Sequence, residues 1–473
     1  MSFGVDIPPR LLAYAAVAGP ALAALACLAF AAPWSVRLLA AGTAAYVVLS
    51  LFLHPRHSVL RDPFAIHNLS RVSVLVGCVF SALFVASERW RQNEELILLV
   101  LVIALISVLI ADLGNLFVPA ATPSPIRRRD PSAHAALLVC LTFFALGWLW
   151  RTYALSHGLL QGTLLGTRLE LTGASNTYGT LNGMATIAMW GCVVFADRPR
   201  RILPLVAMEI AWLLITGSKA ASVSILLPFA MVLYHRRLLR VDLRFVALVV
   251  LLLAVFVGSF VVIHGYRVAV ARQISEVGYV EFDPIRAAGD IELAPDDFEL
   301  VGQALAGRLN FAERFLLILE SERRTPRPAW HGSSYLTALM WPIPRAVWPD
   351  KPSMSLGRYF ATEYLGWGDE SRSEAGITLW GEGFRNFGIA GALLSPALWM
   401  IFLQGLYSLA MRAGRWGLFY VAAAYMVMAN SLPVNVALPV ASLSQLAAVL
   451  LLFRAGTAVV AALARLGKVQ VHG

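Results

Sequence analysis

The sequence is poor in charged residues and in cysteine. Only 14% of its 473 residues are charged, against about a quarter in an ordinary soluble domain, and 59% are hydrophobic. This balance excludes a soluble enzyme and any fibrous or disordered class. The four cysteines are Cys27, Cys78, Cys140 and Cys192, and all of them lie in apolar runs. They show no Cys-x-x-Cys spacing and no Cys/His group, so nothing supports a disulfide or a bound metal such as zinc. The composition is that of a polytopic membrane protein.

Long hydrophobic runs are abundant. A helix that crosses a bilayer needs about 20 mostly apolar residues. Twelve stretches meet this criterion: 11–32, 36–53, 70–87, 96–118, 135–152, 179–196, 202–217, 219–234, 245–264, 386–411, 416–432 and 436–454. We expect the first to remain as a span rather than to be cleaved as a signal peptide, because Asp6 precedes it and the next stretch follows almost at once. The predicted fold is therefore an all-α membrane protein with about twelve transmembrane helices.

The distribution of basic residues predicts the orientation. Counted together with the adjoining span ends, the N-terminus, the loops after the even-numbered spans and the C-terminal tail hold 19 of the 38 basic residues, whereas the short loops on the other side hold 6. Basic loops stay in the cytoplasm, so both termini are predicted to be cytoplasmic. The net charge of +10 then reflects these loops and does not imply nucleic acid.

One segment differs in composition from the rest. Residues 265–385, between spans 9 and 10, hold 13 basic and 17 acidic residues, a net charge of −4. We expect three parts: a membrane domain over 1–264, a large extracytoplasmic helical loop over 265–385, and the last spans with a cytoplasmic tail over 386–473. Within the loop, Asp296-Asp297 can cap one helix whose apolar face continues to Leu319.

A proline-rich loop in this segment carries two cations. Four prolines lie between residues 342 and 352, interleaved with Trp341 and Trp348, so the stretch cannot be a helix interior. It holds Arg345 and Lys351 six residues apart on a stiff backbone, an arrangement that suits a diphosphate. Alternatively, Arg345 pairs with Asp350 while the tryptophans anchor the loop among lipid headgroups.

A second group of polar residues lies at the start of span 10. Glu382 and Arg385 are three residues apart and share a helix face, next to Trp380. The carboxylate could act as a general base; the alternative is an ion pair that caps the helix.

Several other polar residues are candidates. Lys219 lies in an outer Thr-Gly-Ser-Lys turn, where lysine also commonly extends toward the interface. Glu209 and Asp112 lie within spans, where carboxylates are costly and are functional candidates unless they are hydrogen-bonded packing groups.

The outer side also offers bases and aromatic rings. His157, His264 and His331 face outside by topology, and each could be a base. Tyr335 and the tryptophans could stack on sugar rings or form an interfacial belt.

Three of these stretches together resemble a known family. They are the Thr-Gly-Ser-Lys turn at 216–219, the Gly-Ser-Ser-Tyr stretch at 332–335 leading into the loop at 343–352, and the Gly-Glu-Gly-Phe-Arg-Asn-Phe-Gly stretch at 381–388. Their order and the topology resemble the Wzy-type O-antigen and exopolysaccharide repeat-unit polymerases. The resemblance covers mainly residues 175–395.

This resemblance implies a GT-C-type glycosyltransferase at the outer face of the bacterial inner membrane. Its donor and acceptor would be oligosaccharides linked to undecaprenyl diphosphate, with no cofactor and no metal. A flippase and a chain-length regulator would be its partners. The resemblance carries over Lys219 as the cation of the turn, Arg345 and Lys351 as the cations of the loop, and Glu382 as the carboxylate. Together with the other candidates, we predict Glu382, Arg345 and His331 as catalytic residues, Arg345, Lys351, Lys219, Arg267 and Arg385 as diphosphate ligands, and Trp341, Trp348, Tyr335 and Trp380 as sugar-binding residues. Lysine at 219 departs from the arginine more usual in the family.

Two alternatives stay open. An O-antigen ligase shares the carrier and the layout but transfers glycan to lipid A core. A secondary transporter or lipid-linked oligosaccharide flippase also fits twelve spans, although the sequence shows no internal repeat.

Overall fold

The computed structural model describes residues 32–88, 93–121, 131–156, 174–215, 221–240, 310–340, 356–368 and 375–470, with isolated positions between 242 and 309 and at 343 and 348. All the regular structure in these residues is helical. In the part of the chain that the structure describes, six helices are long and apolar enough to cross a membrane: Trp34–Leu53, Ile66–Ala86, Glu94–Asn115, Ser132–Ala154, Leu379–Arg412 and Ala437–Leu466. Two shorter apolar helices cover Gly183–Phe195 and Ser224–His235. The expected helical membrane protein is confirmed at this coarser level.

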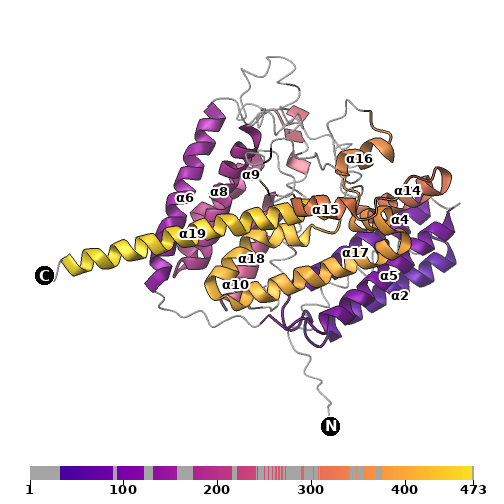
Figure 1. The fold of residues 1–473 in the computed structure, drawn as a ribbon, viewed down its shortest axis with the longest axis horizontal. Coiled ribbons are helices and arrows are strands. Elements are labelled where there is room, and N and C mark those ends of the chain that lie inside the picture. The colour runs from indigo at the N-terminus through magenta and orange to yellow at the C-terminus, as the bar shows by residue number, and fades with distance from the viewer. Residues whose placement is uncertain are drawn as a thin grey trace, which may run out of the picture.

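The helices form two groups (Figure 1). The first contains α2 (Trp34–Leu53), α3 (Ile66–Val74) with the π-helical η1 (Leu75–Phe80) and α4 (Ser81–Glu88), α5 (Glu94–Asn115) and α14 (Phe311–Arg324). The second contains α6 (Pro131–Ser156), α8 (Ala174–Phe195), the short η2 (Pro199–Ile202), α9 (Leu203–Ile215), α10 (Ala221–His235), α18 (Gly414–Ala429) and α19 (Ala437–Gln470). α17 (Leu379–Arg412) packs on α3 and α5 of the first group and on α18 of the second, so it joins them.

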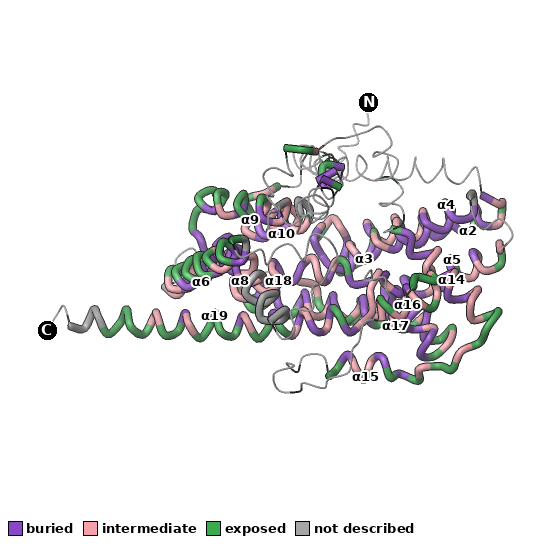
Figure 2. The backbone as a smooth tube through the Cα atoms, turned by 90° about the horizontal axis from the view of Figure 1, so that it is seen from above, coloured by how far each residue is buried: buried purple, intermediate pink, exposed green. Residues whose placement is uncertain are grey.

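Two short helices lie at one end of α17. α15 (Ser333–Met340) contacts both α17 and the start of α19, and α16 (Leu356–Glu363) lies near α14 (Figure 1). α19 continues well beyond the rest of the bundle, and Figure 2 shows exposed residues along that extension.

The helix expected from Asp296-Asp297 to Leu319 is not continuous. Asn310 is non-helical, and its side chain accepts a hydrogen bond from Glu313 N at 3.1 Å, so it caps a new helix, α14. The apolar face of α14 packs against α4, α5 and α17. The ring of Phe311 fills the space that a Cβ on Gly77 would occupy in η1.

α17 is broken sharply near its beginning. Phe387 and Gly388 leave helical geometry, and Gly388 has φ 63° and ψ −148°, a conformation essentially restricted to glycine. In one continuous helix Gly383 and Gly391 would be about 12 Å apart along the axis. Here they touch, because a Cβ on either one would overlap the backbone carbonyl of the other. Residues 379–386 therefore fold back onto the start of 389–412, and the second part rises about 36 Å, enough to cross a bilayer.

The glycine contact gives a test of this bend. We expect Gly391→Ala to lower the free energy of unfolding by about 1–3 kcal/mol, because the new methyl group overpacks against the carbonyl of Gly383. Gly405→Ala, on the same helix with open space around it, should be neutral or slightly stabilising. Thermal unfolding of the detergent-solubilised protein measures both. Equal stability of the two variants would contradict the bend.

Candidate functional site

Glu382 lies buried where three helices meet. Its Oε1 accepts a hydrogen bond from Ser334 Oγ of α15 at 2.8 Å, and its Oε2 accepts one from the backbone N–H of Val436, just before α19, at 2.7 Å. Thr378 begins the short helix by accepting a hydrogen bond from Gly381 N at 3.2 Å. No described cation forms an ion pair with Glu382, so hydrogen bonds alone hold this carboxyl group.

Asn386 completes a closed set of hydrogen bonds around Glu382. Its Nδ2 donates to Ser334 Oγ and to the carbonyl of Glu382, both at 2.8 Å, and its Oδ1 accepts from Gly332 N at 2.9 Å. We call Glu382, Ser334, Asn386 and Gly332 the Glu382 site. Two of the three stretches that carry the family resemblance, 332–335 and 381–388, therefore meet here.

His331 projects from a tight turn beside this site. His331 and Gly332 have φ values of 48° and 87°, as in a type I′ turn, and Ser333 N donates to Trp330 O at 2.9 Å. Trp330 N donates to Arg385 O at 2.8 Å, which fixes the turn on the short helix of α17. The side chain of His331 is exposed at the tip of the turn, whereas Glu382 is enclosed.

Arg385 has a carboxylate partner, but that partner is not Glu382. Its guanidinium pairs with Glu322 of α14 at 2.9 Å, donates to Pro328 O at 2.9 Å, and lies over the Trp330 ring at 5.2 Å. Glu322 also accepts from Tyr364 OH at 2.8 Å, and burial together with this contact raises the pKa of Tyr364. The charge of Arg385 is thus already balanced inside the protein, and its role as a diphosphate ligand stays a prediction.

The aromatic candidates lie in different surroundings. Tyr335 OH is 2.6 Å from Ser395 Oγ, which joins α15 to the second part of α17. Trp380 is buried in the apolar core, and its indole N–H meets no acceptor among the described residues. Trp348 is half-buried. Their binding of sugar is untested.

Seven candidate site residues lie outside the described residues: Arg345, Lys351, Lys219, Arg267, Trp341, His157 and His264. α15, which carries Ser334, ends at Met340, about 9 Å along the helix from that residue.

No protein-family model, curated protein or solved structure matches the chain. The family resemblance accordingly rests on the sequence motifs and their order.

Glu209 is held by a buried ion pair. Arg151 of α6 donates to both carboxylate oxygens of Glu209 on α9, and Thr186 Oγ1 donates to Oε2 at 2.7 Å. The guanidinium also lies over the rings of Trp148 and Trp212, at 5.3 and 4.9 Å. Both charged side chains are at most 1% exposed. Glu209 therefore holds α6, α8 and α9 together. This is the packing role that the sequence analysis gave as the alternative to a functional role.

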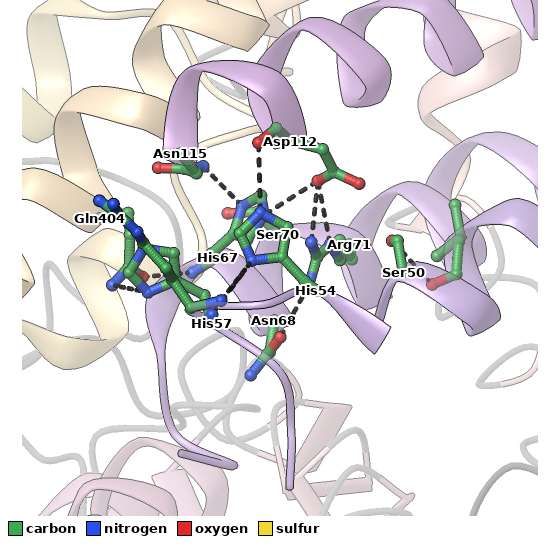
Figure 3. A network of polar contacts seen from close by, with 12 residues as sticks. Ser50, His54, His57, His67, Asn68, Ser70, Arg71, Asp112, Asn115 and Gln404 are labelled. Carbon is green, nitrogen blue, oxygen red and sulfur yellow. Dashed lines mark hydrogen bonds and ion pairs between the residues drawn. The ribbon is translucent and has the colours of Figure 1, made fainter. Parts of the chain in front are cut away.

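A larger polar network surrounds Asp112 near the C-terminal end of α5 (Figure 3). The Oδ1 of Asp112 lies 2.9 Å from both Arg71 Nη2 and His67 Nε2, and its Oδ2 accepts from Tyr46 OH at 2.7 Å. We call the following set of residues the inner polar network: His54, His57, His67, Arg71, Asp112, Asn115 and Gln404. The sequence analysis named Asp112 as a candidate but did not identify its partners, although three histidines and an arginine within 18 residues were a usable signal.

The hydrogen bonds assign one tautomer to two of these histidines. His57 Nδ1 is 3.2 Å from Gln404 Nε2, and His54 Nδ1 accepts from His57 N at 3.1 Å, so both Nδ1 atoms are acceptors. The Nε2–H groups then face the carbonyls of Val118 and Asp112, at 3.1 and 3.2 Å. Both rings are neutral in this arrangement. Burial lowers the pKa of His57 to about 4 and also lowers the pKa of His54. Among the described residues, no group of three or more His, Cys, Asp or Glu could hold a metal ion.

The Glu322 ion pair can be tested against an exposed one on the same helix. We expect Glu322→Gln to lower the free energy of unfolding by about 3 kcal/mol, because Arg385 keeps its charge in a buried place without a carboxylate. Glu320→Gln removes only the i, i+4 pair with the exposed Arg324 and should change the stability by at most about 1 kcal/mol. Denaturation in detergent measures both, and similar losses would contradict the buried pairing.

The histidines predict a pH dependence of stability. The unfolded chain takes up a proton on His57 below about pH 6.5, whereas the folded protein resists it until about pH 4. Stability should therefore fall as the pH drops from about 6.5 towards 4. His57→Asn should reduce this loss by about 1 kcal/mol, a value that allows for solvent screening. Unfolding temperatures at several pH values check this, with the exposed His134→Asn as a control that keeps the wild-type dependence.

Proposed function

We propose that the chain is a membrane glycosyltransferase of the GT-C type, with about twelve spans, that polymerises oligosaccharide repeat units linked to undecaprenyl diphosphate. The observation that carries the proposal is the meeting of two motifs that are about 50 residues apart in the sequence. Ser334 Oγ lies 2.8 Å from Glu382 Oε1, and Gly332 N lies 2.9 Å from Asn386 Oδ1. In the proposed topology both termini are cytoplasmic, and residues 265–385 lie outside the bacterial inner membrane.

The proposed reaction needs cations and a base at one place. An acceptor hydroxyl attacks the anomeric carbon of the donor sugar, the bond to the carrier diphosphate breaks, and the hydroxyl proton passes to a base. The departing diphosphate is assigned to Arg345 and Lys351, with Lys219 and Arg267 as further ligands. The leaving group is good enough that the reaction as proposed uses no metal or nucleotide sugar.

Two residues compete for the role of the base. Glu382 has the required chemistry, but both its oxygens already accept hydrogen bonds from within the protein. His331 is exposed on a rigid turn whose position the short helix of α17 fixes. We therefore favour His331 for the proton transfer and Glu382 for positioning the turn and α15, through Ser334 and Asn386.

An O-antigen ligase is the nearest alternative, because it would use the same carrier and the same groups. A proton-coupled carrier is the second alternative, and the inner polar network is the observation that favours it. Buried ionisable side chains in membrane helices commonly mark a proton or ion pathway. All the network's charged members described here have partners, however, as a packing role also requires.

A deletion in the native host separates these functions. Loss of the long surface-polysaccharide ladder with one repeat unit still attached supports a polymerase. Loss of all attached glycan, with lipid-linked polymer accumulating, indicates a ligase. An unchanged ladder counts against both.

The site itself is tested by complementation with Arg345→Ala. We expect short chains at a normal protein level, because the departing diphosphate loses its bidentate cation. Arg323→Ala, an exposed arginine of the same outer segment, should restore full length. Full-length polymer with Arg345→Ala would remove the proposed diphosphate site.

A further inference from the structure

Three chain segments meet at the end of α8 through two arginines. Arg236, just after α10, donates to Val193 O at 2.9 Å and to Asp197 O at 3.3 Å, and Arg415 of α18 donates to Phe195 O at 3.4 Å. These carbonyls belong to the last turn of α8 and the residues after it, where backbone acceptors lack helical partners and the helix dipole is negative. Arg236 and Arg415 therefore bring together the end of α8, the end of α10 and the start of α18.

Six more arginines surround this junction, and all of them are exposed. They lie within four residues of Asp197, Arg236 or Arg415, and we call them the arginine face: Arg198, Arg200, Arg201, Arg237, Arg240 and Arg412. None of them forms an ion pair with another described residue. Elsewhere in the described chain arginines are commonly paired, as Arg71, Arg151, Arg324, Arg327 and Arg385 are.

The backbone supplies a second, independent observation. α10 ends in a Schellman motif, with Leu238 N donating to Leu233 O and Arg237 N to Tyr234 O, both at 2.9 Å. The residue at the left-handed position of this motif is Arg237, with φ 58°, where glycine is favoured. The fold thus tolerates backbone strain at a position that presents an exposed guanidinium.

The neighbouring residues indicate what the arginine face meets. Leu203 and Leu238 are 47% and 58% exposed, and the apolar helices α9 and α10 begin and end here. Exposed leucines beside exposed arginines are typical of a surface at the boundary between hydrocarbon and headgroups. Six like charges also repel one another, so a partner that supplies negative charge is favoured.

We propose that the arginine face binds the phosphate groups of anionic phospholipids in the leaflet on its own side of the membrane. Guanidinium groups grip phosphate bidentately, and the adjoining leucines contact the upper acyl chains. By the distribution of basic residues this is the cytoplasmic leaflet. The site is independent of the glycosyl transfer proposed above, which takes place at the other end of the helices.

The test uses the full chain in a neutral detergent, titrated with phosphatidylglycerol or with phosphatidylcholine. We expect phosphatidylglycerol to raise the unfolding temperature and to remain bound in native mass spectra, with an affinity that falls as salt is added. The zwitterionic lipid should do neither. Equal effects of the two lipids would overturn the proposal, and so would full competition by glycerol phosphate, which would indicate a site for a soluble phosphate compound.

A matched pair of double variants locates the site. Arg200→Gln with Arg201→Gln should weaken the binding of phosphatidylglycerol about 25-fold, at about fivefold per arginine near an anionic surface. Arg323→Gln with Arg324→Gln removes two adjacent exposed arginines at the end of α14 and should leave the affinity unchanged. Equal losses in both double variants would overturn the assignment.

Arg237→Gly separates binding from folding. Glycine relieves the strain at φ 58°, so the variant should unfold at a higher temperature in neutral detergent than the wild type. Its affinity for phosphatidylglycerol should nevertheless fall about fivefold. A more stable protein with unchanged lipid affinity would exclude Arg237 from the site and contradict the arginine face as defined.

Discussion

The backbone contact between Gly383 and Gly391 holds the helices around Glu382 in place. Two helix axes can approach this closely only where side chains are missing, and the turn between them needs the conformation of Gly388. Because residues 379–386 fold back, Glu382 points to α15 and to the start of α19 instead of into the bilayer. The positions of Ser334, Asn386 and the turn with His331 all follow from this contact.

A second constraint is that buried polar groups need partners where no water reaches them. The structure meets it in three ways. The Arg151–Glu209 pair balances its charges and stacks on two tryptophans. The charge of Asp112 is balanced by Arg71, and its carboxylate oxygens also contact Tyr46 OH and His67 Nε2. Glu382 has no described counter-charge and depends on donated hydrogen bonds alone, which distinguishes it from the other two carboxylates.

The sequence predicts the helices well, because a bilayer requires long apolar runs. The predicted stretches 36–53, 96–118 and 135–152 match α2, α5 and α6 within a few residues. The predicted span 386–411 begins next to the bend at Phe387–Gly388, but hydropathy does not reveal that residues 379–386 form a short helix that folds back onto this span. It also does not reveal the cap at Asn310, where one side chain starts a new helix.

Partners of charged residues were harder to predict than their positions. Spacing within the sequence placed Glu382 next to Arg385, but the fold pairs Arg385 with Glu322, which is 63 residues away in the chain. The inner polar network depends likewise on contacts between α3, α5 and α17. Such contacts depend on the packing of helices, which one sequence does not specify.

The length of α19 has a mechanical consequence. Its apolar part, Ala437–Leu466, is about 45 Å long, whereas the hydrocarbon core of a bilayer is about 30 Å thick. Tilting alone would need an angle of about 48°, beyond the usual range, so this helix is sensitive to the thickness of the membrane. Its first turn is tied to Glu382 through the N–H of Val436. The sequence therefore joins an apolar helix longer than the bilayer core directly to the residue whose N–H holds the Glu382 carboxylate.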